Sequence, residues 1–341
     1  MGGAGAVSPA GWSVSALQEA VTRGEPLPTK DLTRPGPKHP LRVRAVPTPN
    51  PRPAFISHPR LRRSSPIALH AVSAALEALG PDAAKVSSGE LRLGIVLCVM
   101  SGCVTYSRRF YDETLRDPGT ASPLVFPETV FNAPASHLGA LLGTTAINYT
   151  LVGDPSTFLQ GLALAADWLE GKRVDGCLVI GAEEMDWLVP DAFSLFNGLA
   201  VISDGAGAMY LHRVPETQPA VKLDAITHTH IFGQTQTRTA AARRARAEIG
   251  AGSAKDLLCD GLQDISRLDR PEELAWQDWP GARISPKKIL GEGLMAGTAW
   301  QCVLAWQALR ERHYSAAVVS AVGCNQQAIA ARFALPTPTE I

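Results

Sequence analysis

Continuous apolar runs alternate with amphipathic stretches along most of residues 67–212. The continuous runs predict strands buried on both faces, and the stretches whose apolar positions recur every three or four residues predict covering helices. The expected strands are residues 91–100, 146–152, 176–181 and 207–212, and the expected helices are residues 67–79, 110–115, 132–142 and 156–169. This alternation predicts an α/β protein whose mixed or parallel sheet is covered on both faces.

The same alternation starts again after residue 215. Here the pattern predicts strands over 221–229, 316–322 and 327–333, and helices over 238–249, 254–265 and 293–311. We therefore expect two α/β halves, residues 1–215 and a shorter half, residues 216–341. No short-period repeat is visible, which argues against a solenoid.

Residues 25–66 are dense in proline. Proline lacks a backbone N–H and fixes φ, so this stretch cannot be a regular helix or a central strand. We expect it to wrap the surface of the first half as an extended segment.

Composition narrows the possible functions. Lysine plus arginine equals aspartate plus glutamate, 32 each, so no net charge attracts the chain to nucleic acid or to a membrane. The apolar runs are too short to span a bilayer, and no signal segment opens the chain, so the default compartment is the cytoplasm. The 6 cysteines show neither CxxC pairing nor metal-ligand spacing, and we expect no metal or other cofactor.

One stretch has the layout of an enzyme's nucleophile turn. Residues 145–165, TAINYTLVGDPSTFLQGLALA, read as a strand, a break at Asp154 and Pro155, and a helix, but they contain no cysteine. Ser156 and Thr157 follow the break. Hydroxyls at a helix start commonly cap it, and no histidine has an assigned place beside them, so we interpret both residues as caps.

Several segments resemble, in order, the β-ketoacyl synthase branch of the thiolase superfamily. They are GAGAVSPAG (3–11), GIVLCVMSG (94–102), SPLVFPETVFNAPASHLGALLG (122–143), DGCLVIGAEEM (175–185), DGAGAMYL (204–211), SPKKILGEGLMAG (285–297) and SAVGCNQQAIAA (320–331). The resemblance implies a thiolase-like fold, in which two related βαβαβ halves form α-β-α-β-α layers. The first strand looks truncated at Met1, so we expect the native chain to begin upstream.

The catalytic positions depart from that family. Active members carry a cysteine where the helix N-terminus favours a thiolate, and two histidines come from the second half. Aligning on GLALA (161–165) places Pro155 at the cysteine position, with Asp154 as its neighbour. Asp260 replaces the first histidine and Glu292 the second, and the late glycine-rich loop has become GCNQQ (323–327). Because all of these elements differ together, the resemblance implies a subunit with no catalytic residues of its own.

Within this family such subunits are known as chain-length factors. The resemblance implies a heterodimer with an active ketosynthase, and contact with an acyl carrier protein either directly or through that partner. INYTLV (147–152) would be the pairing strand, and residues 126–132 would approach the partner's tunnel. The implied interface and tunnel residues are Phe126, Phe131, Asn132, Asn148, Tyr149 and Leu151. The pathway would make a type II polyketide, an aryl polyene or a fatty-acid-like product.

Other readings stay open at this point. Asp154, Asp260 and Glu292 would all point into the former active site, where three carboxylates could bind a cation or act as acid and base. That pocket would suit a cysteine-independent acyltransferase or hydrolase of the same fold, although capping and pairing with lysines such as Lys287 is the favoured interpretation. A homodimeric module that binds acylated carrier protein is a further alternative.

Three smaller features have ordinary interpretations. Glu183 and Glu184 are expected to be a buried structural pair. His228 and His230 could bind a metal but lack a third ligand, so we expect them to face solvent. Two arginine groups could dock an acidic carrier protein, but solvated faces are favoured; they are Arg60, Arg62 and Arg63, and Arg238, Arg243, Arg244 and Arg246.

Overall fold

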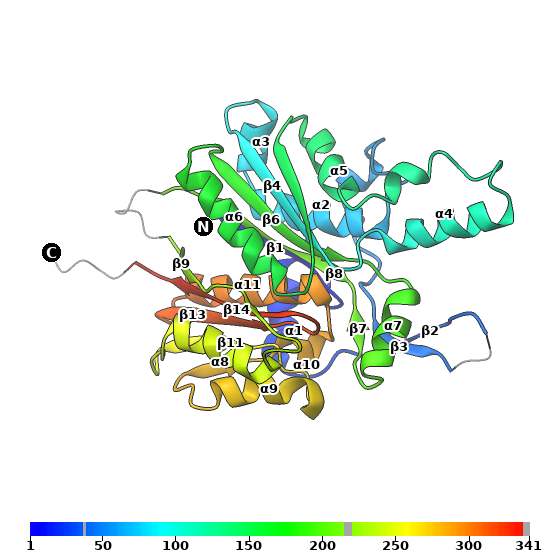
Figure 1. The fold of residues 1–341 in the computed structure, drawn as a ribbon. Helices are drawn as coiled ribbons and strands as arrows, with labels where there is room; N and C mark the ends of the chain where they lie inside the picture. The colour runs from blue at the N-terminus through cyan, green and yellow to red at the C-terminus, as the bar shows by residue number, and fades with distance from the viewer. Residues whose placement is uncertain (37–38, 215–219, 337–341) are drawn as a thin grey trace.

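The computed structural model describes residues 1–36, 39–214 and 220–336. The expected boundary between the halves, at residue 215, lies outside the described residues. Within them the chain forms two large mixed sheets and one small one. Figure 1 shows the two large sheets as separate layers, one above the other, with helices between them and on their outer faces.

The first large sheet has the strand order β1-β8-β6-β4-β5. Its members are β1 (Gly3–Val7), β4 (Leu93–Val99), β5 (Ile147–Val152), β6 (Gly176–Glu183) and β8 (Gly205–His212). β4 runs parallel to β5 and β6, whereas β8 runs antiparallel to β6 and β1. The central strands are buried along their whole length, as their continuous apolar sequences predict.

The second large sheet has the order β10-β14-β13-β11-β12, with β9 also paired to β14. Its members are β9 (Lys222–Ile226), β10 (His230–Ile231), β11 (Asp256–Cys259), β12 (Ala282–Ile284), β13 (Ala316–Val322) and β14 (Gln327–Ala334). β11 is parallel to both β12 and β13, and β14 is antiparallel to β13.

Helices complete the α-β-α-β-α layers (Figure 1). The outer layers are α2 (Pro66–Leu79) and α5 (Ala133–Leu142) on the first sheet, and α8 (Arg238–Ile249) and α9 (Ser266–Trp276) on the second. Between the sheets lie α1 (Val14–Arg23), α6 (Thr157–Glu170) and α11 (Leu294–Arg310). α11 contacts both sheets and is buried around most of its circumference, which explains why its sequence is apolar on all sides.

The remaining elements lie at the edges of these layers. They are α3 (Asp82–Ser87), α4 (Val104–Arg116), α7 (Leu188–Phe196), α10 (Pro286–Leu290), two 3₁₀ turns (Ala54–Ser57 and Phe126–Glu128), and the small sheet of β2 (Lys30–Leu32), β3 (Leu41–Arg44) and β7 (Ile202–Ser203). No helix in the described ranges is both long enough and apolar enough to cross a membrane.

Two expectations from the sequence need correction. The predicted helix over 254–265 is wrong, because residues 256–259 form the fully buried strand β11 between β12 and β13. Four apolar or buried positions in a row suit a strand with neighbours on both sides. The proline-rich segment is not wholly irregular, since β3 lies at the centre of the small sheet. Its four residues, Leu41–Arg44, contain no proline and can therefore donate to both neighbours.

Candidate functional site

The turn between β5 and α6 occupies the position of the expected nucleophile. β5 ends at Val152 and α6 begins at Thr157. Pro155 is buried in this turn and has no nucleophilic atom. The Ser156 hydroxyl is buried as well, and it donates to the Gln327 carbonyl oxygen at 3.4 Å. The turn therefore carries no thiol, and its hydroxyl is already engaged.

Asp154 binds the loop that joins β13 to β14. Its Oδ2 accepts hydrogen bonds from the backbone N–H groups of Gln326 at 2.8 Å and Gln327 at 3.0 Å. Its Oδ1 accepts from the Cys324 N–H at 3.1 Å. Backbone donors converging on one point are the usual means of holding an oxyanion. In this chain those donors are occupied by a carboxylate of the protein itself.

The loop approaches the turn closely because residue 323 is glycine. A Cβ on Gly323 would overlap the Asp154 carboxylate. At the start of β14, the Gln327 side-chain amide donates to the Thr157 hydroxyl at 2.9 Å. The first turn of α6 and the β13–β14 loop are therefore locked together by side-chain and backbone hydrogen bonds.

Asp260 faces a second buried carboxylate. Its Oδ1 accepts from the Ser285 hydroxyl at 2.6 Å, while Oδ2 is buried and without a hydrogen-bond partner in the described part of the chain. Glu272 accepts from the Gly261 N–H at 3.1 Å and from the Ser320 hydroxyl. Burial, and then the charge of Asp260, raise the pKa of Glu272 to about 7. Burial also raises the pKa of Asp260.

Glu292 pairs with Lys287 inside the protein. The Lys287 ammonium lies 2.7 Å from Glu292 Oε2, and both side chains are nearly inaccessible to solvent. Glu292 Oε1 also accepts from the Leu294 N–H at 2.9 Å, at the start of α11. Burial alone would lower the pKa of Lys287, but the charge and hydrogen bond of Glu292 outweigh it, so the pKa is raised.

The three carboxylates have different direct partners, and a shared acidic pocket stays a prediction. Asp154 binds loop amides, Asp260 faces Glu272 and Ser285, and Glu292 pairs with Lys287. No group of three or more histidine, cysteine or acidic side chains in the described ranges has a metal-binding arrangement. For Glu292, pairing with lysine is the interpretation that the structure confirms.

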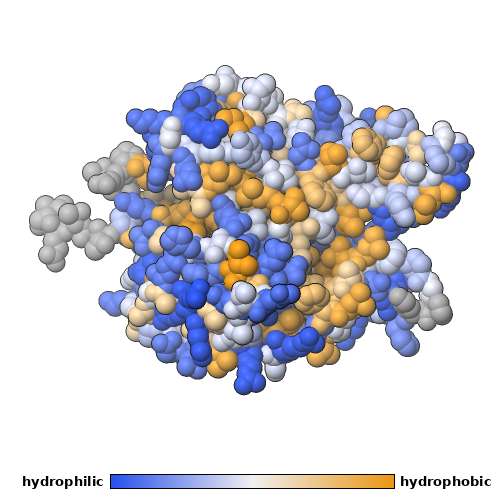
Figure 2. Space-filling model, viewed as in Figure 1, coloured by the Kyte–Doolittle hydropathy of each residue, from blue (hydrophilic) through white to orange (hydrophobic). Residues whose placement is uncertain are grey.

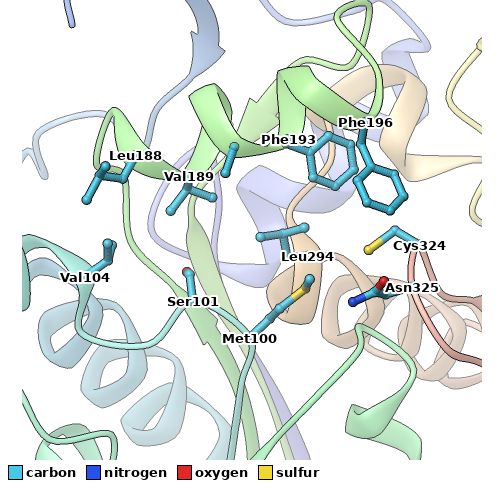
Figure 3. Close-up of a pocket in the computed structure, with 11 residues that line it drawn as sticks. Met100, Ser101, Val104, Leu188, Val189, Phe193, Phe196, Leu294, Cys324 and Asn325 are labelled. Atoms are coloured by element: carbon cyan, nitrogen blue, oxygen red, sulfur yellow. The ribbon is translucent and has the colours of Figure 1, made fainter. Parts of the chain in front are cut away.

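An apolar cavity of about 360 Å³ lies beside this region (Figure 3). It is lined by Met100, Ser101, Val104, Leu188, Val189, Ala192, Phe193, Phe196, Leu294, Cys324 and Asn325. None of the three replacement carboxylates is among them. Sequence reasoning missed this cavity because it did not predict α7, which supplies five of these side chains. The apolar positions 188, 189, 193 and 196 are the signal that could have revealed the helix.

Buried glutamates hold the first-sheet side of the cavity. Glu183 accepts from the N–H groups of Met100 at 2.7 Å and Ser101 at 3.0 Å. Glu184 accepts from Ile67 N–H at 3.1 Å and Thr105 N–H at 2.7 Å, at the starts of α2 and α4. Burial raises the pKa of both glutamates to about 7. The pair is structural, as the sequence predicted.

The six expected interface and tunnel residues do not line this cavity. Phe126 is 55% exposed and Tyr149 is 47% exposed, although Tyr149 also packs edge-on against Trp168. Phe131 and Asn148 are exposed, and Leu151 packs partly against the core. Asn132 precedes α5. These residues lie on the surface of the single chain, so their part in a tunnel stays a prediction.

Two weaker candidates also have a structural explanation. His228 and His230 both contact Glu248, at 2.7 Å and 3.0 Å. The His228 side chain is 90% exposed, as expected, but His230 is only 17% exposed. In the second arginine group, Arg238 donates to two backbone carbonyls and Arg246 lies over Trp276, whereas Arg243 and Arg244 are exposed, as expected for a solvated face.

No protein-family model matches the sequence, and no curated protein matches it. Solved structures match over almost the whole chain. The ishigamide ketosynthase/chain length factor is 19% identical, covers 99% of both chains and has a TM-score of 0.81. The ketosynthase in complex with its type II polyketide synthase acyl-carrier protein and bound to the hexaketide is 15% identical, with 98% of both chains covered and a TM-score of 0.77. A β-ketoacyl synthase from Burkholderia phymatum STM815 is 13% identical, with 98% of both chains covered and a TM-score of 0.75.

These likenesses define the class of fold. The chain has the thiolase-like fold of the ketosynthases and ketosynthase/chain length factors, as the ordered sequence segments predicted. At such low identity the likeness establishes the architecture, and the argument for function depends on the residues of the site.

Proposed function

We propose that this chain is a non-condensing ketosynthase-like subunit of the chain-length-factor type. The observation that carries the proposal is the position of the Asp154 carboxylate on the N–H groups of residues 324, 326 and 327. A condensing enzyme needs a thiol at the helix start and free donors for the oxyanion. Here Pro155 takes the first position, and Asp154 occupies the donors of the β13–β14 loop.

The proposed partner is an active ketosynthase, and the proposed contact begins at β5. β5 is the last strand of its sheet in the described ranges, and it exposes Ile147, Tyr149 and Val152. An exposed edge strand with apolar side chains offers unpaired backbone groups to another strand. Monomeric proteins usually cover such an edge strand or place charged side chains on it. The apolar side chains exposed on β5 therefore favour pairing with a partner.

Apolar surface continues from this edge toward α4. The exposed residues there include Leu115, Leu124, Phe126 and Phe131. Figure 2 shows apolar residues gathered on the side of the molecule where Figure 1 places α4 and α7. Exposed apolar patches larger than a few hundred Å² mark interaction sites in soluble proteins. We infer that Phe126, Phe131 and Tyr149 shape the tunnel of the partner, in a pathway that makes a type II polyketide, an aryl polyene or a fatty-acid-like product. An acyl carrier protein would deliver its substrates.

Co-expression with the ketosynthase encoded beside this chain tests the proposal. We expect a stable heterodimer on size exclusion, and condensation of malonyl-carrier substrates that requires both chains. A self-contained homodimer whose activity disappears when Asp154, Asp260 and Glu292 are each replaced by alanine would overturn the proposal. That outcome would favour a cysteine-independent acyltransferase or hydrolase.

A further inference from the structure

A second cavity, of about 620 Å³, lies at the opposite edge of the first sheet from β5. It is bordered by the first residues of β1, the end of α2 and the end of α11. Met1 lines this cavity, and Figure 1 places the N-terminus on the side of the molecule away from α4 and α7. The second cavity is therefore separate from the expected pairing strand and from the apolar cavity of Figure 3.

The side chains around this cavity carry more positive than negative charge. Arg310 and Arg312 line it, at the end of α11 and just after it, and both are exposed. Glu77 on α2 is the one acidic residue among the lining residues, all of which belong to the described part of the chain. Two guanidinium charges against one carboxylate favour an anion in the cavity.

The two arginines have no partner inside the protein that would use their charge. Within the described ranges neither guanidinium group donates a hydrogen bond or forms an ion pair. Arg310 lies over the Trp306 ring at 4.7 Å, which orients the guanidinium group and leaves its N–H groups available. Glu311, between the two arginines in the sequence, does not line the cavity, and its carboxylate accepts from the Gln18 side-chain amide at 2.7 Å.

The other ionisable groups at the cavity are already engaged or uncharged. Glu77 accepts from the backbone N–H groups of Ala6 at 2.8 Å and Val14 at 2.9 Å, and burial raises its pKa. The Met1 amino group donates to a backbone carbonyl at 2.8 Å. Burial lowers the pKa of His212, which favours the neutral imidazole. The two arginines are therefore the groups left to bind a charged ligand.

The size of the cavity and its charge together indicate the class of ligand. Sites for small molecules usually enclose about 300–1,000 Å³, and this cavity has about 620 Å³, so it holds more than a bare anion. A phosphate ester carries a charge of about −2 near pH 7, which matches two arginines better than a single carboxylate does. The planar guanidinium group also binds two phosphate oxygens at once.

We propose that this cavity binds a small phosphate ester, with its phosphate held by Arg310 and Arg312 and its polar body toward Gly80 at the end of α2. Glycine at residue 80 leaves open space on that side, because a Cβ there would meet no atom within 4 Å. The site goes beyond the proposed function and does not depend on it, since it uses neither β5 nor the Asp154 turn.

Isothermal titration calorimetry on the full chain tests this site. The probes are ribose 5-phosphate and adenosine 5′-monophosphate, with ribose as the neutral control, inorganic phosphate as the bare anion and succinate as the carboxylate control. We expect both esters to bind more tightly than inorganic phosphate, and ribose not to bind. Binding should weaken as the ionic strength rises, because salt screens exposed charges. Tighter binding of adenosine 5′-monophosphate would assign the site to a nucleotide, and equal binding would assign it to a sugar phosphate.

Two substitutions locate the phosphate. Arg310→Gln and Arg312→Gln should each weaken the binding of ribose 5-phosphate at least about tenfold, because each removes hydrogen bonds between charged groups. Arg310→Lys retains the charge without the planar fork and should lose less. The matched control Arg244→Gln removes an exposed arginine from α8, outside the cavity, and should leave the affinity unchanged.

Three results would overturn the site. They are no binding of either ester, inorganic phosphate or succinate binding as tightly as the esters, and unchanged affinity in both glutamine variants. Circular dichroism and thermal unfolding show whether each variant is folded. If one glutamine variant fails to fold, the other decides the result.

Discussion

Asp154 and Gly323 lie so close together that a Cβ on Gly323 would overlap the Asp154 carboxylate. Asp154 lies in the turn between β5 and α6, and Gly323 lies in the loop after β13. The contact joins the first part of the chain to the last, at the place where a ketosynthase would perform its chemistry. Under the proposed function, this hydrogen-bonded link takes the place of a reactive centre.

Replacing Asp154 should therefore affect stability. The variant Asp154→Ala leaves the N–H groups of Cys324, Gln326 and Gln327 without their acceptor. We expect the free energy of unfolding, measured with urea, to fall by about 3 kcal/mol. Asp154→Asn retains one acceptor oxygen and should lose less. The exposed Asp31→Ala is the control and should stay within about 0.5 kcal/mol of the unchanged chain. An Asp154→Ala chain as stable as its parent would contradict the account.

Stability should also depend on pH through Glu272. Its pKa is raised from the ordinary 4.5 to about 7, first by burial and then by Asp260. Between these values the folded chain holds a proton that the unfolded chain has lost, so this contribution is present at acid pH and is lost as the pH rises through about 7. Glu272→Gln should flatten the fall of unfolding free energy over this range.

Asp260→Asn provides the companion test of that pH dependence. It removes a neighbouring negative charge, so it should lower the pKa of Glu272 and shift the fall in stability toward lower pH. Burial raises the pKa of Glu183 and of Glu184 to about 7 as well. These two glutamates should therefore contribute the same pH dependence of stability to the parent and to both variants. A Glu272→Gln profile that is superimposable on the parent profile would refute this role.

The Lys287–Glu292 pair should behave as a unit. Removing one partner leaves the other charge buried without compensation, which costs about 3–5 kcal/mol. We expect Lys287→Met and Glu292→Gln each to destabilise the chain strongly, and the double variant to lose clearly less than the sum. A urea-denaturation double-mutant cycle measures the coupling. Strict additivity would show that the 2.7 Å contact contributes little.

The exposed edge strand gives a test of partner binding. Tyr149→Lys places a charge on β5, where the side chain is 47% exposed. It should abolish heterodimer formation on size exclusion while changing thermal unfolding of the isolated chain only slightly. Ile231→Lys is the matched control, because Ile231 is 69% exposed on β10, in the other large sheet. If both variants still dimerise equally well, β5 is not the pairing strand.

The sequence predicted much of the fold because its signals there are local. Leu93–Val99 and Ala316–Val322 are continuous apolar runs, and such runs indicate buried strands without any knowledge of their neighbours. The prediction of a helix over 254–265 was wrong because the apolar run at 256–259 is short enough to fit either a helix turn or a strand. Pairing with β12 and β13 makes it a strand.

The site was less accessible to sequence reasoning because its contacts are not local. Pro155 could be placed on the turn from the neighbouring helix pattern. The hydrogen-bond partners of Asp154 could not be predicted in this way, because the loop that binds Asp154 lies 170 or more residues later in the chain. Asp260 and Glu272 are close in the sequence, but their mutual effect depends on burial, with Asp260 directly after β11 and Glu272 on α9. Of the direct partners of the three carboxylates, the loop amides for Asp154 and Ser285 for Asp260 could not be read from the sequence pattern, whereas pairing of Glu292 with Lys287 was the favoured interpretation.

The origin of condensing activity in the heterodimer tests the central claim most directly. The measurement is malonyl-carrier condensation by the complex after replacing the partner's nucleophilic cysteine by alanine, and separately after Asp260→Ala in this chain. The account predicts that the first change abolishes product, that the second leaves the turnover of the assembled complex nearly unchanged, and that this chain alone makes none. Condensation that survives loss of the partner's cysteine would show that this chain has a reactive centre of its own.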